Sequence, residues 1–454
     1  MRNLRPLLAA AALVLSTAPA YADLGDQVYK LLPDDGAASD LFGRSVAISG
    51  ATAVVGAYQD DDNGGNSGSA YLFSTTTGMQ TAKLLPDDGA ANDHFGFSVA
   101  ISGATTIVGA QLDADNGTDS GSAYLFDTTT GTQMAKLLPN DAAAFDHFGF
   151  SVAISGATAI VGAPFDDDNG NNSGSAYLFD TTTGTQIAKL LPNDDAGGDR
   201  FGSSVAISGA TAIVGAYRDD DSGDDSGSAY LFDISDPAKP TQIVKLLPND
   251  GAASDEFGFS VAISDATAIV GARRDADNGT DSGSAYLFDT TTGTQIAKLL
   301  PDDGAASDEF GFSVAISGAT GIVGALHDGD NGPTSGSAYL FDTTDGRQLF
   351  KLLPIDGEAS DQFGLSVAIR GATAIVGADF DDDNGAESGS AYLFEASSCP
   401  WDVDNNGSVG ASDLLLLLFY YGMPCKDCPF DFDGDGNVGA SDLLALLFHW
   451  GPCP

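Results

Sequence analysis

Basic residues are scarce in this sequence. Lys and Arg together number 18 against 64 Asp and Glu, and the formal net charge is −46. A chain this acidic repels the phosphates of nucleic acids and the head groups of anionic membranes, so neither is expected as a partner. Only four His and four Cys are present. They form no His/Cys metal cluster, and the sequence shows no nucleophile–base pair and no phosphate-binding loop.

Long hydrophobic runs are also missing beyond the N-terminus. The longest, Leu414 to Tyr421, is far shorter than the roughly 20 residues that a membrane helix requires. The first 22 residues contain two arginines, a short apolar stretch and a small-x-small cleavage site that ends at Ala22. This pattern predicts a signal peptide over residues 1–22. We therefore expect a secreted protein, extracellular or at the cell surface, without a membrane span.

Seven copies of one sequence unit fill residues 23–396. Each unit contains a Phe-Gly pair, which begins at Phe42, Phe95, Phe148, Phe201, Phe257, Phe310 and Phe363. Short segments rich in β-branched and aromatic residues, bounded by Gly, Asp, Asn or Pro, predict four strands per unit. In the second unit these strands are expected at Ser98–Ser102, Thr106–Ala110, Ser122–Asp127 and Gln133–Leu138. Equal four-stranded units predict an all-β, seven-bladed β-propeller.

The ends of the repeat region predict how the ring closes. The last unit ends at Phe394 without the Lys-Leu-Leu-Pro strand that follows every other unit. That strand occurs at the N-terminus, within Gln27 to Leu32, so we expect it to complete the seventh blade and to hide both sheet edges. Tyr124 and Phe126 point to the same face of their strand, and we expect this face to form the interface between blades.

The repeat resembles the FG-GAP repeat of integrin alpha-subunit propellers and related bacterial secreted proteins. The matching residues are Phe95-Gly96, Ser98 to Ala100 and, in the best copy, Val161 to Pro164. The resemblance implies a propeller fold, and this fold is compatible with adhesion, scaffolding and several enzymatic activities. Integrin-type propellers hold calcium in the turn between the first and second strands. Here that turn is only Ser102 to Thr105, so the integrin calcium site has no counterpart.

Most carboxylates are expected on one face of the ring, in the loops that follow the second and fourth strands. An Asp-rich loop after the second strand could hold calcium through closely spaced oxygens, or it could simply form Asx turns. The paired aspartates of this loop are Asp60 and Asp62, Asp113 and Asp115, Asp166 and Asp168, Asp219 and Asp221, Asp275 and Asp277, Asp328 and Asp330, and Asp381 and Asp383. We expect this acidic face to recognise a protein or carbohydrate ligand.

A further aspartate stands two residues before each Phe-Gly pair. Because it recurs in all seven copies, we expect it to stabilise a turn rather than to act in catalysis. The residues are Asp40, Asp93, Asp146, Asp199, Asp255, Asp308 and Asp361. His94 and His147 stand beside this motif and are interpreted as incidental.

Residues 397–454 contain two copies of a different module. Each copy has oxygen-bearing side chains at calcium-loop spacing, with Gly at the sharp turn, which predicts two Ca²⁺ sites. The predicted ligands are Asp402, Asp404, Asn406, Ser408 (through its carbonyl) and Asp413 in the first copy, and Asp431, Asp433, Asp435, Asn437 and Asp442 in the second. A leucine-rich helix is expected after each loop, at Leu414 to Tyr421 and at Leu443 to Trp450.

This tandem arrangement resembles type I dockerin domains, which implies a small α-helical calcium-binding domain that binds a cohesin-like protein. Ala411, Ser412, Ala440 and Ser441 match the positions that face a cohesin in that family. The four cysteines allow three pairings, and the duplication favours Cys399–Cys425 and Cys428–Cys453.

The sequence therefore favours a secreted, non-catalytic binding or adhesion protein that is anchored by its C-terminal domain. One alternative is a carbohydrate-active enzyme, a propeller polysaccharide lyase or hydrolase tethered by a dockerin. Nearly identical blades argue against this alternative, because catalysis requires one blade to differ. A purely structural component of a cell surface is a third possibility.

Overall fold

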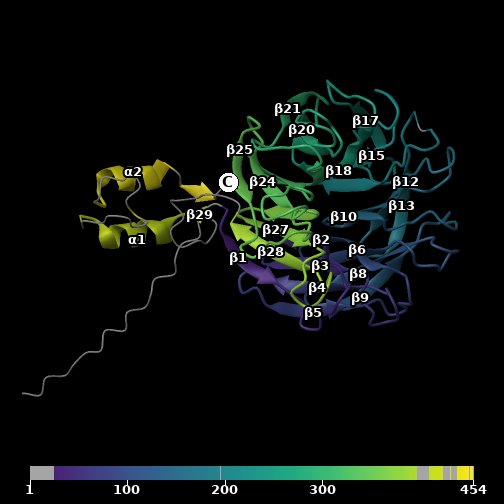
Figure 1. Ribbon diagram of the computed structural model, residues 1–454, viewed down its shortest axis with the longest axis horizontal. Coiled ribbons are helices and arrows are strands. Elements are labelled where there is room, and N and C mark those ends of the chain that lie inside the picture. Colours follow the sequence, from purple (N-terminus) through teal and green to yellow (C-terminus); the bar gives the residue numbers. More distant parts are fainter. Residues whose placement is uncertain are drawn as a thin grey trace, which may run out of the picture.

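The computed structural model describes residues 25–194, 196–395, 408–422, 430, 437–448 and 450–452. The predicted signal peptide lies outside these residues. Strands β1 to β28 form seven antiparallel sheets of four strands each, and the sheets surround a central axis (Figure 1). The predicted seven-bladed propeller is confirmed. Within the described ranges, no helix has the length and apolar character needed to cross a bilayer.

The two strands nearest the axis carry Phe-Gly-x-Ser-Val-Ala-Ile and Ala-Ile-Val-Gly-Ala or close variants. The innermost strands are β2 (Phe42–Ser49), β6 (Phe95–Ser102), β10 (Ser151–Ser155), β14 (Ser204–Ser208), β18 (Phe257–Ser264), β22 (Phe310–Ser317) and β26 (Ser366–Arg370). The second strands are β3 (Thr52–Ala57), β7 (Thr105–Ala110), β11 (Thr158–Ala163), β15 (Thr211–Ala216), β19 (Thr267–Ala272), β23 (Thr320–Ala325) and β27 (Thr373–Ala378).

The two outer strands carry Ser-Ala-Tyr-Leu-Phe and the Lys-Leu segment. The third strands are β4 (Ser69–Ser74), β8 (Ser122–Asp127), β12 (Ser175–Asp180), β16 (Ser228–Asp233), β20 (Ser284–Asp289), β24 (Ser337–Asp342) and β28 (Ser390–Glu395). The outermost strands are β5 (Gln80–Leu84), β9 (Thr132–Leu137), β13 (Thr185–Leu190), β17 (Thr241–Leu246), β21 (Gln295–Leu299), β25 (Gln348–Leu352) and β1 (Gln27–Leu31). We number the blades 1 to 7 in the order of their innermost strands.

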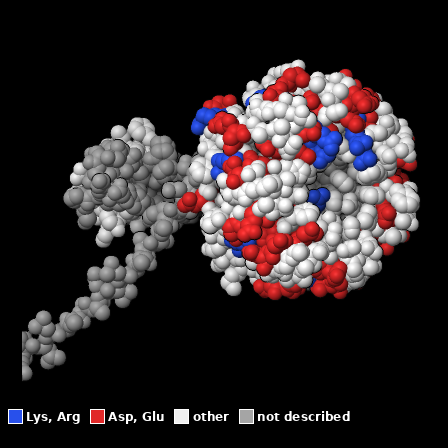
Figure 2. All heavy atoms as spheres, in the orientation of Figure 1, with Lys and Arg blue, Asp and Glu red and all other residues white. Residues whose placement is uncertain are grey.

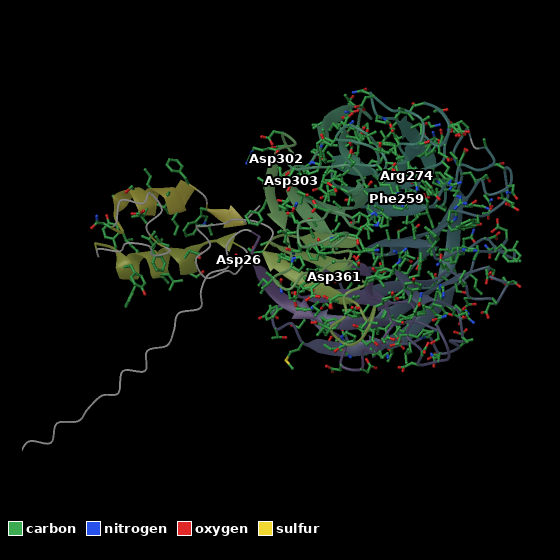
Figure 3. All side chains as sticks on the ribbon, in the orientation of Figure 1. Asp26, Phe259, Arg274, Asp302, Asp303 and Asp361 are labelled. Atoms are coloured by element: carbon green, nitrogen blue, oxygen red, sulfur yellow. The ribbon has the colours of Figure 1, made fainter. Side chains whose placement is uncertain are left out.

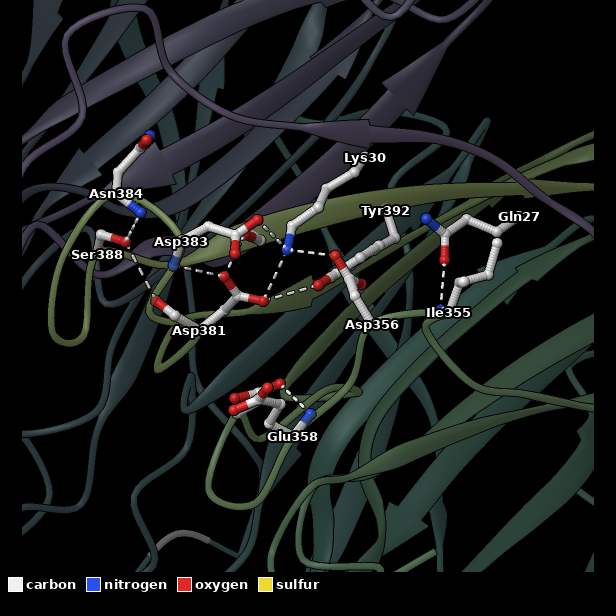
Figure 4. Close-up of polar contacts among 12 residues, drawn as sticks. Gln27, Lys30, Ile355, Asp356, Glu358, Asp381, Asp383, Asn384, Ser388 and Tyr392 are labelled. Carbon is white, nitrogen blue, oxygen red and sulfur yellow. Dashed lines mark hydrogen bonds and ion pairs between the residues drawn. The ribbon is translucent and has the colours of Figure 1, made fainter. Parts of the chain in front are cut away.

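The ring closes as predicted, because β1 is the outermost strand of blade 7. It pairs antiparallel with β28, with Lys30 opposite Tyr392 and Leu31 opposite Ala391. The side chain of Gln27 also accepts a hydrogen bond from the backbone N–H of Ile355 at 2.8 Å (Figure 4). Residues from the two ends of the propeller thus share one sheet, which leaves no unpaired edge between the first and last units.

The hydrophobic core lies between adjacent blades. In the interface between blades 1 and 2, Phe95 packs edge-to-face on Tyr124 and Phe126, with ring centres 5.5 and 5.7 Å apart. Leu72 and Leu84 of blade 1 belong to the same buried cluster. The predicted aromatic interface is confirmed, and it repeats around the ring.

The Phe-Gly pair has a backbone role as well as a packing role. Gly96 has φ +91°, and a Cβ atom at this position would lie 2.2 Å from the carbonyl oxygen of Ser69, so no larger residue fits. Beside it, Ser98 Oγ donates a hydrogen bond to the carbonyl of Gly149 in the next blade at 2.8 Å. These contacts hold neighbouring innermost strands together around the axis.

The C-terminal part contains two short helices, α1 (Ala411–Tyr420) and α2 (Ala440–Phe448), and a small two-stranded sheet formed by β29 (Ser408–Val409) and β30 (Gly451–Pro452). Both helices begin three residues earlier than predicted. The cause is a capping contact, because the carboxylates of Asp413 and Asp442 accept the backbone N–H groups of Gly410 and Gly439 at 2.7 Å.

Leu417 and Leu446, one from each helix, are fully buried together with Val438. The helices therefore contribute to a shared core, as the duplication suggests. Other large apolar side chains of the helices remain exposed, with Leu415 69%, Phe419 72% and Phe448 78% accessible.

Candidate functional site

The paired aspartates of the Asp-rich loops surround a lysine in every blade. In blade 1, Lys83 Nζ lies 2.8 Å from Asp35, 3.0 Å from Asp60 and 2.6 Å from Asp62. Burial disfavours the charged ammonium, but the hydrogen bonds that Lys83 donates to the three carboxylates outweigh this effect and raise the pKa of Lys83 above its usual range. We call each such set a lysine cage. The role of this repeated lysine was not predicted from the sequence.

The cage of blade 7 also joins the two ends of the propeller. Lys30 of β1 contacts Asp356 at 2.9 Å, Asp381 at 3.0 Å and Asp383 at 2.6 Å, and Tyr392 donates to Asp381 at 2.7 Å (Figure 4). Lys136, Lys189, Lys245, Lys298 and Lys351 occupy the same place in the other five blades, and each contacts three aspartates.

Every aspartate of the predicted calcium pairs contacts the lysine of its own blade. The first members of the pairs are nearly buried, and they are Asp60, Asp113, Asp166, Asp219, Asp275, Asp328 and Asp381. The second members are about half exposed, and they are Asp62, Asp115, Asp168, Asp221, Asp277, Asp330 and Asp383. The cation between each pair is therefore an ammonium group of the chain itself, which the sequence analysis did not expect.

This arrangement bears directly on the calcium hypothesis for the propeller loops. A calcium ion between the paired aspartates would compete with an ammonium group that already contacts both of them. Among the residues that the structure describes, no group of three or more His, Cys, Asp or Glu side chains is placed to hold a metal ion. Calcium binding by the propeller loops stays a prediction, and the contacts favour the structural role of these aspartates.

The aspartate before each Phe-Gly pair stabilises a turn, as expected from its sevenfold recurrence. Asp40 accepts the backbone N–H of Ala37 at 2.6 Å, and the same bond recurs in the other blades. Burial makes ionisation of these carboxyl groups unfavourable and raises the pKa of Asp40, Asp93, Asp146, Asp255 and Asp361 to about 6.

Only part of the predicted C-terminal calcium sites falls on described residues. Asp413 and Asp442 are fully buried and cap their helices, and Asn437 lies just before α2. Ser408 belongs to β29. The remaining predicted ligands and all four cysteines lie outside the described residues, namely Asp402, Asp404, Asn406, Asp431, Asp433, Asp435, Cys399, Cys425, Cys428 and Cys453. The two calcium sites and both disulfides therefore stay predictions.

The sevenfold repetition is broken around the mouth of the central channel. Four positions per blade vary in size and charge there: the residues directly before and after Phe-Gly, and the two residues after the second strand. We call these positions the collar. Around the ring, the residues flanking Phe-Gly are Leu41 and Arg44, His94 and Phe97, His147 and Phe150, Arg200 and Ser203, Glu256 and Phe259, Glu309 and Phe312, and Gln362 and Leu365. The residues after the second strand are Tyr58-Gln59, Gln111-Leu112, Pro164-Phe165, Tyr217-Arg218, Arg273-Arg274, Leu326-His327 and Asp379-Phe380.

The collar surrounds a cavity of about 290 Å³ on the axis of the propeller. Its walls are the residues after Phe-Gly and the Ser-Val pairs that follow them, together with Tyr217. Figure 2 shows the central hollow, with basic side chains near it and acidic side chains mostly farther out. In Figure 3, Phe259 and Arg274 of blade 5 mark the collar. Five arginines lie at the collar, whereas the repeated lysines of the propeller lie on the outermost strands.

Collar residues leave several buried polar atoms without a hydrogen-bond partner. Among the described residues, the buried side-chain atoms lacking a partner are one repeated serine hydroxyl in six blades and four collar atoms. The collar atoms are His94 Nδ1, Gln111 Oε1, Arg218 Nε and Asp379 Oδ1. Burial raises the pKa of Asp379 to about 6, although the nearby Arg44 opposes this. Unsatisfied buried polar atoms are costly, and these four lie at collar positions, although none of the four residues lines the cavity itself.

Blade 4 opens a notch in the wall of this cavity. The residue after Phe-Gly is Phe97, Phe150, Phe259 or Phe312 in four of the blades, but it is Ser203 in blade 4. The small side chain leaves Tyr217 exposed to the cavity, and Tyr217 is the one cavity-lining residue that does not come from an innermost-strand segment. We call the space between Ser203 and Tyr217 the blade-4 notch.

The collar was not predicted from the sequence, although the repeats contain a signal for it. His94 and His147 were interpreted as incidental because their neighbours vary between copies. That variation is the signal, because the aspartate and the Phe-Gly pair beside these positions are the same in all seven copies. It also removes the argument that nearly identical blades exclude catalysis, because the blades do differ at the collar.

Comparison with known proteins identifies the repeat. The FG-GAP repeat family matches seven segments, residues 26–73, 79–126, 132–179, 185–232, 240–288, 294–341 and 347–394. No curated protein matches the chain significantly. A crystal structure of the computationally designed Ika8 protein is similar with a TM-score of 0.46 and 14% identity, over 82% of this chain and 100% of the designed one. Each matched segment contains the outermost strand of one blade and the three inner strands of the next. Since the seven segments account for most of the sequence, the chain belongs to the FG-GAP repeat family.

Proposed function

We propose that this protein is a secreted, non-catalytic binding protein whose propeller holds its ligand at the collar. An FG-GAP propeller is in general a binding or adhesion type of repeat. The observation that carries the proposal is the asymmetric set of side chains at one cavity mouth, which includes five arginines and, among the described residues, four buried polar atoms without a partner. Positions that only maintain a fold repeat in every blade, whereas a site for one ligand requires an asymmetric set of side chains.

The proposal places recognition at the centre of the acidic face rather than in its loops. The loop carboxylates hold lysines and turns, as the bonds of Asp60 and Asp40 illustrate. Their recurrence in every blade supports a structural role. The collar, in contrast, combines aromatic rings with charged groups of both signs, which is the usual composition of a ligand-binding surface.

The test uses one substitution that restores the common residue. Ser203→Phe introduces the side chain that four other blades already accommodate, so the propeller should fold while the blade-4 notch is filled. The full-length protein, its Ser203→Phe variant and a Ser203→Ala control are applied to arrays of carbohydrates and peptides. We expect the wild type and the Ala control to bind the same ligand and the Phe variant to bind at least tenfold more weakly.

Equal binding by all three proteins would place the ligand outside the collar and overturn this part of the proposal. Release of sugar fragments by the wild type, lost in the Phe variant, would instead favour the lyase or hydrolase alternative.

We also propose that the C-terminal domain anchors the protein through a calcium-dependent contact with a cohesin-like protein. Support comes from the duplicated calcium-loop sequence and from the burial of the two acidic residues at its twelfth positions, Asp413 and Asp442. The exposed apolar side chains of Phe419 and Phe448 offer a surface for a partner. A pull-down with immobilised cohesin and the full-length chain tests this contact, with EGTA as the control. Retention that is unchanged by EGTA, or no retention, would count against the anchor.

A further inference from the structure

Blade 4 places two arginine side chains next to the tyrosine that lines the notch. Arg200 Nη1 donates a hydrogen bond to the hydroxyl oxygen of Tyr217 at 3.1 Å, and its guanidinium carbon lies 4.4 Å from the ring centre of Phe165. The guanidinium carbon of Arg218 lies 5.5 Å from the ring centre of Tyr217. Two positive charges therefore stand beside one wall of the cavity.

These two arginines lack the counterion that the neighbouring blade provides. In blade 5, Glu256 contacts Arg273 Nε at 2.6 Å and Arg274 Nη1 at 3.1 Å. The residue that corresponds to Glu256 in blade 4 is Arg200 itself, so blade 4 has a second cation where blade 5 has an anion. Among the described residues, neither Arg200 nor Arg218 forms an ion pair with a carboxylate.

No described carboxylate contacts either arginine directly, although Asp225 and Glu256 favour the charged form of Arg218 at longer range. The missing contact is accompanied by an unmet hydrogen bond, because Arg218 Nε is buried and has no acceptor among the described residues. A buried guanidinium N–H without an acceptor is unfavourable, and an anionic oxygen in the notch would remove that penalty.

We infer that the blade-4 notch binds the carboxylate or sulfate group of an acidic saccharide. The inference rests on the proposed function, because it assigns a ligand class to the collar. Guanidinium groups suit oxyanions, since their N–H donors form a planar fork that matches two oxygens. The anionic group accepts hydrogen bonds from Arg200 and Arg218, and Ser203 is small enough to admit it.

The remainder of the cavity wall suits a sugar ring. Phe150 precedes Ser203 around the axis and Phe259 follows it, and Phe259 packs on Tyr217 with ring centres 5.5 Å apart. Aromatic faces next to an anion site can pack against the C–H face of a pyranose while its charged group reaches the arginines. At about 290 Å³ the cavity lies at the lower end of the range for ligand pockets, so it accommodates one sugar residue and not a folded partner.

The acidic surroundings set the mode of binding. Red spheres surround the hollow in Figure 2, so a long polyanion lying across this face would be repelled. A chain end or a single acidic residue that enters the cavity avoids most of this repulsion. Short acidic oligosaccharides are therefore the expected ligands, and their affinity should depend little on length beyond two or three residues.

The test is calorimetric titration of the full-length protein with defined probes. Oligogalacturonates supply carboxylates, oligosaccharides of dextran sulfate supply sulfates, and neutral dextran oligosaccharides are the uncharged control. We expect binding of at least one acidic probe and none of neutral dextran. Arg200→Gln and Arg218→Gln should each weaken that binding at least tenfold. Arg370→Gln is the matched control, because Arg370 lies on the innermost strand β26 at the end away from Phe-Gly, and it should have no effect.

The outcomes separate this inference from the proposed function. If a neutral ligand binds and only Ser203→Phe abolishes that binding, the collar is the binding site and the acidic saccharide is wrong. Tight binding of poly-glutamate that equals binding of the acidic oligosaccharides would also refute the saccharide class. If acidic probes bind but both arginine variants match Arg370→Gln, the notch is not the anion site. Thermal melts confirm that each variant folds.

Discussion

Lys30 should make a large contribution to the stability of the closed ring. In a Lys30→Met variant the three carboxylates around Nζ lose their cation. Two of them, Asp356 and Asp383, are about half exposed, with side chains 45% and 50% accessible, so solvent screens most of their loss. Asp381 is different, because its side chain is only 5% accessible and would become an unpaired buried charge. Breaking a buried pair in this way costs about 3 kcal/mol, at the lower end of the usual range because Lys30 is itself partly exposed.

Removing the unpaired charge of Asp381 should restore part of the stability that Lys30→Met loses. In a Lys30→Met/Asp381→Asn double variant, the amide oxygen can still accept the hydrogen bond of Tyr392, and no buried anion remains. Equilibrium unfolding in urea, followed by fluorescence and circular dichroism, measures the three free energies of unfolding. We expect the double variant to recover more than half of the loss caused by the single substitution.

A matched variant distinguishes the contribution of a lysine cage to stability from its contribution to ring closure. Lys83→Met removes the same contacts in blade 1, whose four strands are consecutive in the chain. It should lower the free energy of unfolding by a similar amount without opening the ring. Only Lys30→Met should make β1 susceptible to proteolysis. A loss below about 1 kcal/mol in both variants, or no recovery in the double variant, would refute the buried-charge argument.

Two further predictions concern protons and calcium. Burial raises the folded-state pKa of Asp93 to about 6, above its unfolded value, as it does for Asp40, Asp146, Asp255 and Asp361. The stabilising contribution of these carboxyl groups is therefore complete below about pH 4 and is lost as the pH rises through about 6. The cage carboxylate Asp88 has a lowered pKa, because the effect of burial, which opposes ionisation, is outweighed by the hydrogen bond from Lys136. The contribution of Asp88 to the stability of the fold is therefore lost only in stronger acid. The melting temperature should therefore rise as the pH is lowered from 7 to about 5, and it should fall below pH 3. The Asp93→Asn variant should show a smaller rise. A melting temperature that increases steadily from pH 5 to pH 7 would contradict this reasoning. For the C-terminal domain, calcium at about 100 times its Kd should stabilise the folded state by about 2.7 kcal/mol, and Asp413→Ala should weaken this response; an identical melt with calcium and with EGTA would contradict the predicted sites.

The fold could be predicted because the signals that define it repeat. A strand of Tyr-Leu-Phe or Ile-Val-Gly-Ala has the same pattern in seven places, and Gly96 and its counterparts mark a backbone approach that no other residue permits. The missing last strand predicted closure by the N-terminal strand, which is β1. The helix starts were less predictable, because Asp413 and Asp442 serve both as predicted calcium ligands and as caps.

The candidate site was harder to predict because it depends on differences between repeats and on contacts across blades. Lys83 looked like an ordinary strand residue, since its partner Asp35 is far away in sequence. In the sequence, Arg200 and Arg218 are two basic residues among many acidic ones, and only the structure shows that both lie against Tyr217. Proximity of this kind arises only from the three-dimensional arrangement of the blades, whereas the variability at these positions can be read from the repeats themselves.

Closure through β1 also has a consequence for biosynthesis. The ribosome makes β1 first, but its partner β28 is the last strand of the propeller to emerge. A nascent chain therefore carries an unsatisfied strand through nearly the whole of translation, and final assembly waits for a contact between residues very distant in sequence. A prematurely terminated product would expose two unpaired strand edges and would aggregate. Only a completely synthesised propeller would therefore stay soluble.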